Sequence, residues 1–230
     1  DSTSAQIDYT TTAMVSFNTD GFTLGVDTVV NRSAASMVSW SFKKKTKFFD
    51  VVTWTGNGTA GRTISHNLGT TVGCVMIKNT SNAENWMVYH IGSGIDGQLN
   101  LNTNAAAVDE SSQFNDTVPS STVLTLGANS EVNYNGQTYV AYLFAHDTDA
   151  SSIIKCGSYT GTGSANNAVT LGWEPQWLIV KSASGTGSVQ NWDMFDNQRG
   201  FSSGSTTGEL FPNTAIAERT VSNRMNATAT

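Results

Sequence analysis

The sequence predicts an all-β protein made of tandem β-sandwich or jelly-roll-like units, each about 100 residues long. Charged residues make up only 13% of the 230 residues, about half of the roughly 25% found in ordinary soluble domains. Thr, Ser, Asn and Gly take their place, and this composition favours strands joined by tight turns. Short segments of alternating apolar and polar residues, and motifs that recur at a nearly constant spacing, complete the prediction.

Seven segments of one unit have the alternation or the apolar run of a strand, and turn residues separate them. The run at Cys74–Lys78 is almost continuously apolar, which indicates a buried strand. Asn135-Gly136 predicts a hairpin turn, since both residues adopt positive φ at low cost. One short helix is expected at Asn104–Glu110, with Asn104 as its cap. The predicted strands are Phe49–Thr55, Arg62–His66, Cys74–Lys78, Trp86–His90, Gln98–Asn102, Thr122–Leu126 and Thr138–Phe144.

Motifs near the start of the chain recur about one unit later. Phe22–Gly25 matches Leu124–Gly127 (124 − 22 = 102), and Met37–Phe42 matches Tyr139–Phe144 (139 − 37 = 102). Two blocks at the same spacing indicate a repeat.

The pattern continues into the second half of the chain, where loop insertions and deletions change the spacing by a few residues. Thr53–Ala60 matches Ser158–Ala165 (158 − 53 = 105), and Val75–Lys78 matches Leu178–Lys181 (178 − 75 = 103). The last match is Asn85-Trp86 with Asn191-Trp192 (191 − 85 = 106).

These matches divide the chain into three parts. Residues 48–147 form one complete unit, residues 1–44 the C-terminal half of a preceding unit, and residues 150–230 the N-terminal part of a following unit. The chain is then either a window of a longer array or a permuted fold. In a permuted fold, residues 1–44 complete the unit begun by residues 150–230, within one chain or between neighbouring chains.

The charge and the hydropathy exclude several classes of protein. A net charge of −6 and a pI near 4.9 argue against nucleic-acid binding, which needs a basic face. No apolar run approaches the roughly 20 residues of a membrane-spanning helix. The three histidines, His66, His90 and His146, lack metal-ligand spacing. We therefore expect neither an enzyme nor a cofactor.

Carboxylate pairs in predicted loops are the remaining candidates for chemistry. Asp109 with Glu110, and Asp147 with Asp149, could serve a glycosidase or bind Ca²⁺ through oxygen. The segment Asn18–Gly21 has oxygen side chains, but apolar residues follow where further ligands are needed, which favours a simple turn. The sequence therefore predicts no catalytic residue and no metal site.

Aromatic residues are the best candidates for binding, because sugars stack on their rings while polar side chains bind the hydroxyls. The candidate sugar-binding residues are Trp86, Tyr89, His90, Trp192, Phe195 and Asp196. The alternative is that these aromatic rings fill the core. Repeated aromatic positions, Trp40 with Tyr142 and Trp54 with Tyr159, are expected in the core. Cys74 and Cys156 are expected to be small buried residues, and a disulfide between them stays open.

Five motifs in order resemble a β domain of unassigned function that recurs in tandem in tail-fibre-like and other virion proteins of tailed bacteriophages, especially marine ones. The resemblance covers nearly the whole chain and implies a structural role in the virion, with no catalytic residues. The motifs are Phe49–Gly58, His66–Gly69, Val75–Lys78, Asn85–His90 and Tyr139–Phe144.

The resemblance implies a fibre segment at the virion surface that presents loops to a host-surface glycan. Its partners would be other copies of itself and other virion proteins, and a tail fibre would be a homotrimer. A capsid decoration or head-fibre protein is one alternative, and a filament that polymerises by strand complementation is another. A polysaccharide depolymerase is the least favoured.

Overall fold

The computed structural model describes residues 3–7, 12–164, 167–185, 190–200 and 206–222. It is nearly all β, as the composition predicts, and antiparallel strand pairs make up every sheet. The chain divides into two compact units, one of residues 6–43 and one of residues 1–5 with 44–230. No helix in the described part is long and apolar enough to cross a membrane.

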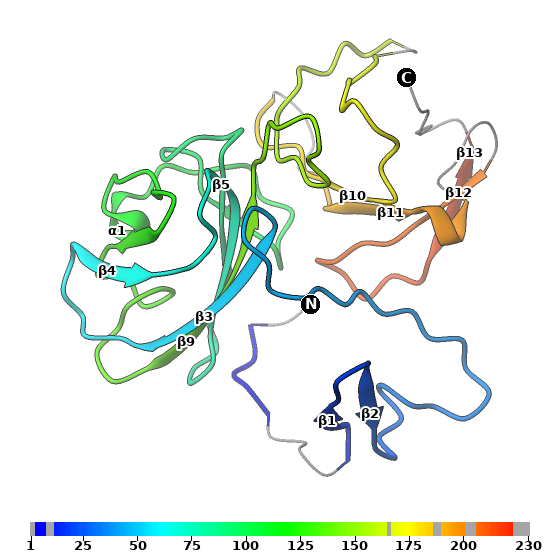
Figure 1. Cartoon of the computed structure of the whole chain (residues 1–230), viewed down its shortest axis with the longest axis horizontal. Coiled ribbons are helices and arrows are strands. Elements are labelled where there is room, and N and C mark those ends of the chain that lie inside the picture. Colours follow the sequence, from blue (N-terminus) through cyan, green and yellow to red (C-terminus); the bar gives the residue numbers. More distant parts are fainter. Residues whose placement is uncertain (1–2, 8–11, 165–166, 186–189, 201–205, 223–230) are drawn as a thin grey trace. The chain divides into compact units, whose positions relative to one another are not determined.

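The larger unit contains a β-sandwich-like body (Figure 1). Its main sheet has the strand order β3-β9-β5-β6-β7, and β4 and β8 form a second, two-stranded sheet. A short helix, α1 (Ser111–Phe114), lies beside β8. The strands are β3 (Phe49–Thr55), β4 (Arg62–Ser65), β5 (Val72–Asn79), β6 (Trp86–His90), β7 (Leu99–Asn100), β8 (Val123–Leu126) and β9 (Thr138–Ala145).

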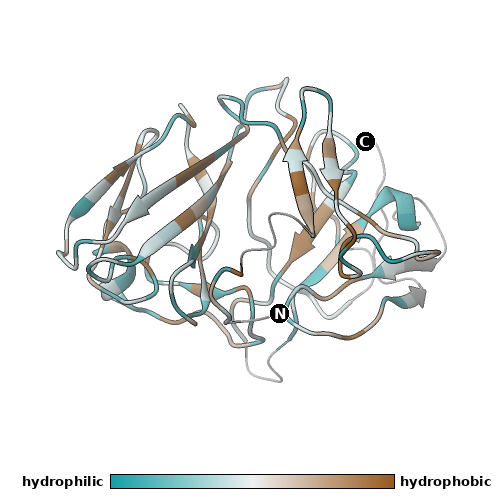
Figure 2. Cartoon of the chain, turned by 90° about the horizontal axis from the view of Figure 1, so that it is seen from below, coloured by the Kyte–Doolittle hydropathy of each residue, from teal (hydrophilic) through white to brown (hydrophobic). Residues whose placement is uncertain are grey.

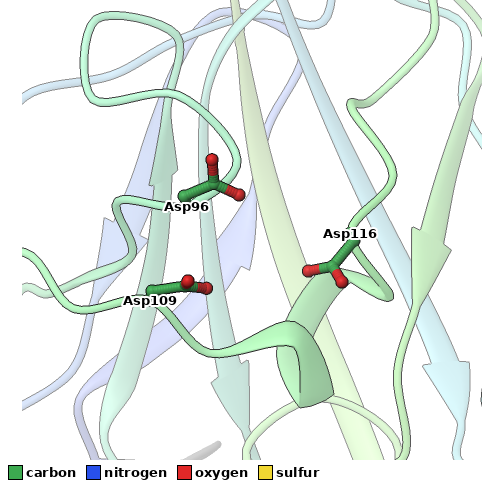
Figure 3. Close-up of side chains that lie close together, drawn as sticks. All are labelled: Asp96, Asp109 and Asp116. Atoms are coloured by element: carbon green, nitrogen blue, oxygen red, sulfur yellow. The ribbon is translucent and has the colours of Figure 1, made fainter.

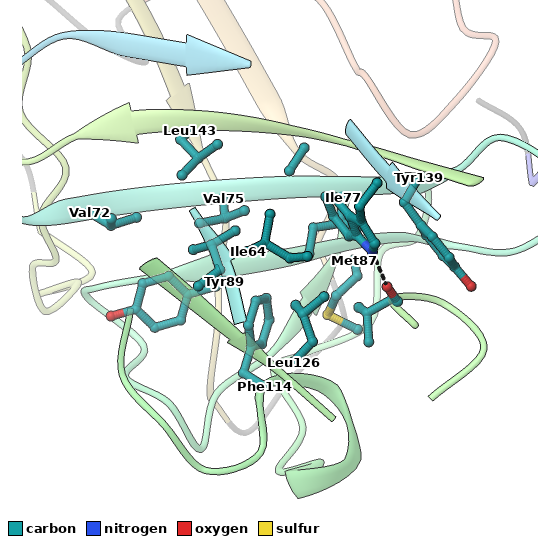
Figure 4. Close-up of a cluster of buried hydrophobic side chains, with 14 of the residues drawn as sticks. Ile64, Val72, Val75, Ile77, Met87, Tyr89, Phe114, Leu126, Tyr139 and Leu143 are labelled. Atoms are coloured by element: carbon teal, nitrogen blue, oxygen red, sulfur yellow. Dashed lines mark hydrogen bonds between the residues drawn. The ribbon is translucent and has the colours of Figure 1, made fainter. Parts of the chain in front are cut away.

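The core lies between these two sheets (Figure 4). Apolar residues are concentrated along the strands (Figure 2), and alternate side chains of each strand point to opposite faces. Ile77 of β5 and Leu143 of β9 therefore face Leu126 of β8, all with no exposed surface. Phe114 of α1 closes the core edge-on against Tyr89, at 5.8 Å between ring centroids.

Strand β5 is buried on both faces, which explains its almost continuous apolar run. The register against β9 shifts between Val72 and Cys74, so Val72 and Val75 both face the core. Cys74 and Met76 lie on the other face, in a second apolar cluster with Trp192.

The second cluster joins the C-terminal part to the main sheet. Trp192 Nε1 donates to Asn100 O at 3.0 Å, and Ala107 N donates to Ala183 O at 2.8 Å. The C-terminal elements are β10 (Trp177–Val180), β11 (Asp193–Asp196), the 3₁₀-helix η1 (Asn197–Arg199), β12 (Thr206–Glu209) and β13 (Arg219–Ser222).

The smaller unit contains one antiparallel hairpin, β1 (Met14–Phe17) with β2 (Phe22–Leu24). Asn18 N donates to Gly21 O at 2.7 Å across the connection. Asn18–Gly21 is therefore the simple turn that the sequence predicts.

The seven predicted strands of the central unit are confirmed, with the fifth shortened to Leu99–Asn100. The predicted helix at 104–110 is wrong. Val108 instead forms a β-bridge with Gln98, which keeps the segment extended, and the helix begins at Ser111.

The predicted Asn135-Gly136 turn exists, but it is not a hairpin turn. Gln137 N donates to Tyr134 O at 3.2 Å, and Gly136 has a φ of 78°. The flanking strands do not pair with each other, because β8 pairs with β4 and β9 lies between β3 and β5.

Strand pairing recurs at the spacing found in the sequence. Val75 pairs with Tyr89 across β5 and β6, and Leu178 pairs with Phe195 across β10 and β11. The shifts are 178 − 75 = 103 and 195 − 89 = 106, as in the sequence matches.

An asparagine clasp also recurs beside these two strand pairs. Asn102 Oδ1 accepts from Trp86 N at 2.8 Å, while Asn102 Nδ2 donates to Asn85 Oδ1 at 2.9 Å. Asn213 makes the same two bonds to Trp192 N and Asn191 Oδ1, at 3.0 and 2.9 Å.

The loop after β2 makes several of the same hydrogen bonds as the loop after β8. Asn31 Nδ2 donates to Gly25 O at 2.7 Å, and Asn133 Nδ2 donates to Gly127 O at 3.0 Å. Inside each loop an Asx side chain accepts from the backbone N–H two residues later, at 2.7 Å and 2.9 Å. These equivalent bonds lie 102 residues apart, the spacing of the sequence motifs.

Candidate functional site

A polar pocket of about 280 Å³ lies where the start of β6, the segment before α1 and the loop after β8 come together. Carboxylates and amides dominate its lining, so most of its polar atoms accept hydrogen bonds. Its lining residues are Glu84, Asn85, Met87, Asn100, Val108, Glu110, Gln113, Asn129, Ser130 and Glu131.

A chain of side-chain hydrogen bonds crosses the polar pocket and fixes Glu131. Asn85 Nδ2 donates to Glu131 Oε1 at 2.8 Å, and Gln113 Nε2 donates to Glu131 Oε2 at 2.5 Å. Glu131 N donates to Asn129 Oδ1 at 2.9 Å, which sets the turn that carries Glu131. Asn85 belongs to the clasp around Trp86, so the pocket is tied to the edge of the main sheet.

Two buried oxygens beside the polar pocket have no hydrogen-bond partner in the described part of the chain: Gln113 Oε1 and Asn100 Oδ1. Gln113 is only 1% exposed. Its Nε2 donates to Glu131 and, at 3.4 Å, to Glu110, which fixes Oε1 as the acceptor of that amide. A buried acceptor without a partner is costly, and these two oxygens have almost no accessible surface.

A second acidic cluster lies close to α1 (Figure 3). Asp109 precedes the helix and Asp116 follows it, and their carboxylates point toward each other, with Asp96 nearby. One oxygen of each lies within 4.8 Å of the others, and all three residues are exposed. Exposed carboxylates of this kind are well solvated without an ion.

The structure does not bring the six predicted sugar-binding residues together as a stacking surface. Tyr89, Trp192 and Phe195 are 2%, 5% and 1% exposed, so their ring faces pack against protein. For these three residues the alternative interpretation, that the rings fill the core, fits the structure.

The other three candidates have identified structural contacts. Trp86 is partly exposed and stacks on Tyr142 at 6.3 Å. His90 Nδ1 accepts from Gly92 N at 3.0 Å, and burial, with neighbouring His146, lowers the pKa of His90. Asp196 caps η1 and forms an ion pair with Arg199. Sugar stacking remains a prediction for Trp86 alone among the aromatic candidates.

Both cysteines are free thiols in the second apolar cluster. Burial raises the pKa of Cys74, and burial raises the pKa of Cys156 to about 12. Neither thiol is activated as a nucleophile, because the thiolate is the reactive form.

Sequence reasoning missed the polar pocket because its residues come from four separate segments. Asp109 with Glu110 was considered as a pair, but only Glu110 lines the pocket. Glu84 and Glu131 lie 26 and 21 residues from Glu110 (110 − 84, 131 − 110), and no ligand spacing links them.

Fold and site together define an all-β, sandwich-like protein with an acidic, oxygen-lined pocket. A family model described as a domain of unknown function, DUF7483, matches residues 1–229. The chain belongs to that family. Neither the curated proteins nor the solved structures include a significant match to the sequence.

Proposed function

We propose that this chain is a structural virion protein of a tailed bacteriophage, a fibre segment that presents loops to a host-surface glycan. One observation supports this proposal most: the same local β structures recur within the chain at the spacing of its sequence repeat. The bond from Asn31 to Gly25 O and the bond from Asn133 to Gly127 O, 102 residues apart, are an example. Repeated β modules extend a protein while each copy keeps its own contacts.

The family resemblance of the motifs is the second support. In a fibre, the partners are further copies of this chain and other virion proteins, in a homotrimer at the particle surface. Loops at one end of the sandwich-like body, together with Trp86 at the start of β6, would meet the host glycan.

The experiment is immunogold labelling of phage particles with antibodies raised against the whole chain. Label on fibres that project from the tail is the expected result. Label distributed over the capsid would instead support the alternative, a capsid decoration or head-fibre protein. Particles without label, from a lysate in which the chain is detected by mass spectrometry, overturn the virion proposal itself. Adsorption of the phage in the presence of excess purified chain then tests attachment, which competition should reduce.

A second candidate, polymerisation by strand complementation between chains, is favoured by a difference in burial. Trp54 and Tyr139 are 8% and 1% exposed and are direct partners across β3 and β9. Their sequence equivalents, Tyr159 and Met37, are each 52% exposed. Within the single chain, Tyr159 is therefore not the core residue that the sequence predicts, and neither is Trp40, which is 38% exposed.

The number of strands in each sheet also favours strand complementation. β5 and β6 lie in a five-stranded sheet, whereas β10 and β11 form a two-stranded sheet. In the central unit β9 pairs with β5. By analogy, residues 37–42 of one chain would pair with β10 of another chain and complete its sheet, as in strand addition.

In the completed sheet, residues 37–42 would also lie beside Tyr159, as β9 lies beside Trp54 of β3, and cross-linking between two single variants tests this contact. Met37→Cys and Tyr159→Cys chains are mixed and oxidised, because directly opposite strand positions bring cysteines within disulfide reach. A covalent heterodimer supports complementation. Val169→Cys replaces Tyr159→Cys as the control, at another site that is 50% exposed. Heterodimer yields no higher than with Val169→Cys reject the candidate.

A further inference from the structure

An indole of the C-terminal part anchors that part on the central unit. Trp192 is 5% exposed and lies in the second apolar cluster with Val88 and Leu99. Its Nε1 donates to Asn100 O at 3.0 Å. This indole therefore has both an apolar surface and a hydrogen-bond acceptor on the central unit, as a buried tryptophan requires.

A lysine contact beside this indole occurs twice in the chain. Lys181 Nζ donates to Asn104 O at 3.2 Å, and Lys78 Nζ donates to Thr3 O at 3.0 Å. Each ammonium group also donates to the backbone carbonyl that precedes its own Asn-Trp pair, at 3.0 and 2.9 Å. The equivalent residues are one repeat apart (181 − 78 = 103, 104 − 3 = 101). Thr3 therefore contacts the central unit as Asn104 contacts the C-terminal part.

Trp86, the repeat equivalent of Trp192 (192 − 86 = 106), lacks the indole contact. The asparagine clasps hold the backbone of both tryptophans in the same way. Trp86 is nevertheless only partly buried, and its Nε1 makes no hydrogen bond among the described residues. The lysine contact is thus present on the central unit, and the indole beside it is open.

The C-terminal part has an apolar pair equivalent to the one that receives Trp192. Met194 pairs with Leu210, as Val88 pairs with Leu99 on the central unit. Val88 and Leu99 are 0% and 4% exposed, whereas Met194 and Leu210 are only partly buried. The pair on the C-terminal part is therefore less covered than its equivalent on the central unit.

The carbonyl that would accept the indole also has an equivalent. Asn100 O accepts from Thr103 N at 3.2 Å, and Phe211 O accepts from Thr214 N at 3.1 Å. A carbonyl oxygen has two lone pairs, so Phe211 O can accept an indole N–H as Asn100 O does.

We propose that Trp86 of one copy of this chain docks on the C-terminal part of a second copy. Its ring covers Met194 and Leu210, and its Nε1 donates to Phe211 O. A second copy is the partner because each chain carries both an open indole and an uncovered apolar pair. The two surfaces differ, so the contact is head-to-tail and further copies can add to either end. The inference rests on contacts within the chain and not on the proposed role in the virion, which its failure would leave standing.

The first test combines sedimentation of the whole chain over a range of concentrations with the NMR signals of its indole groups. The chain should associate as the concentration rises, and the indole N–H signal of Trp86 should shift. The signal of Trp192, which is already bonded within the chain, should not. A chain that stays monomeric overturns the proposal. Association that leaves the Trp86 signal unchanged overturns it too, because the copies would then meet elsewhere.

Two variants test the two surfaces separately. Trp86→Ala removes the indole, and Leu210→Glu places a charge on the apolar pair. Each variant alone should raise the Kd of self-association roughly tenfold or more. Tyr134→Ala is the control, since it removes another aromatic ring that is 54% exposed, and it should leave the Kd unchanged. An equal loss of association in Tyr134→Ala would contradict the assignment of Trp86.

A mixture of the two variants distinguishes the interface from a folding defect. Leu210→Glu chains still offer Trp86, and Trp86→Ala chains still offer Leu210, so the mixture keeps one intact contact. It should form dimers of one chain of each kind, with about the Kd of the unmodified chain, and no longer assemblies. Absence of these dimers, with both variants folded by circular dichroism, overturns the proposal. If either variant does not fold, the indole signals of the unmodified chain decide.

Discussion

Trp54 stacks on Tyr139 with 5.4 Å between ring centroids and 12° between ring planes. The indole Nε1 of Trp54 donates to Val132 O at 3.0 Å, and Tyr139 Oη donates to Ser130 O at 2.8 Å. This aromatic pair therefore joins β3 and β9 to the loop after β8, the loop that also carries Glu131. The same aromatic pair therefore stabilises the core and positions a loop that lines the polar pocket.

Truncation of Trp54 should be among the most destabilising changes in the central unit. Trp54→Ala leaves a cavity beside Tyr139 and removes the bond to Val132 O, which should lower the free energy of unfolding by ~3–5 kcal/mol. Urea denaturation followed by circular dichroism measures it. Tyr159→Ala, at the equivalent but 52% exposed position, should change stability by under about 1 kcal/mol. Equal losses in the two variants would contradict this account of the core.

Gly127 should not tolerate even alanine, because its backbone lies against α1. A Cβ at Gly127 would lie 1.9 Å from Ser112 O, whereas a Cβ at Gly157 would meet nothing within 4 Å. Gly127→Ala should cost at least ~1–3 kcal/mol of stability. Gly157→Ala should be close to neutral, and urea midpoints of the two variants compare them directly. A neutral Gly127→Ala would mean that the close approach to Ser112 relaxes without cost.

Acid should weaken the fold through Asp50. This side chain is buried, which by itself raises its pKa, but bonds from Asn67 N, Lys44 and Val51 N outweigh burial and hold the pKa below its ordinary value. The unfolded chain therefore takes up this proton at a higher pH than the folded chain. The contribution of Asp50 is fully present above the ordinary pKa of about 3.9 and is lost as the pH falls through the folded value.

Comparison with Asp50→Asn tests this pH dependence. At neutral pH the free energy of unfolding of the variant should be ~1–3 kcal/mol lower than that of the unmodified chain. This difference should shrink as the solution becomes acidic. Asp116→Asn, at an exposed position, is the control and should parallel the unmodified chain at every pH. A deficit that stays constant down to low pH would show that the ionisation of Asp50 does not contribute.

The two thiols should react slowly in the folded chain. Cys156 has a pKa of about 12 and Cys74 is buried, so a thiol reagent at pH 8 should modify them on the timescale of unfolding rather than of ordinary thiols. Addition of denaturant should make both thiols reactive at the same time. Rapid reaction of Cys156 in native buffer would show that the second apolar cluster opens readily.

The sequence by itself determined the strands of the central unit. Alternation is a property of neighbouring residues, so Phe49–Thr55 and Thr138–Phe144 could be located without knowledge of their partners. The spacings of 102, 103 and 106 residues likewise identified recurring loops and strand pairs, because equivalent residues make equivalent local bonds. The helix at 104–110 was wrong because Gln98, a residue outside the local pattern, pairs with Val108.

Only the tertiary structure decided which residues meet. It buried Tyr89 in the core between the two sheets, Trp192 in the second apolar cluster, and Phe195 in the C-terminal part, although the sequence offered all three as binding residues. It brought together Glu84, Glu110 and Glu131, which no spacing connects. Local periodicity specifies which face of a strand is apolar, but long-range packing decides what covers that face and which loops converge beside it.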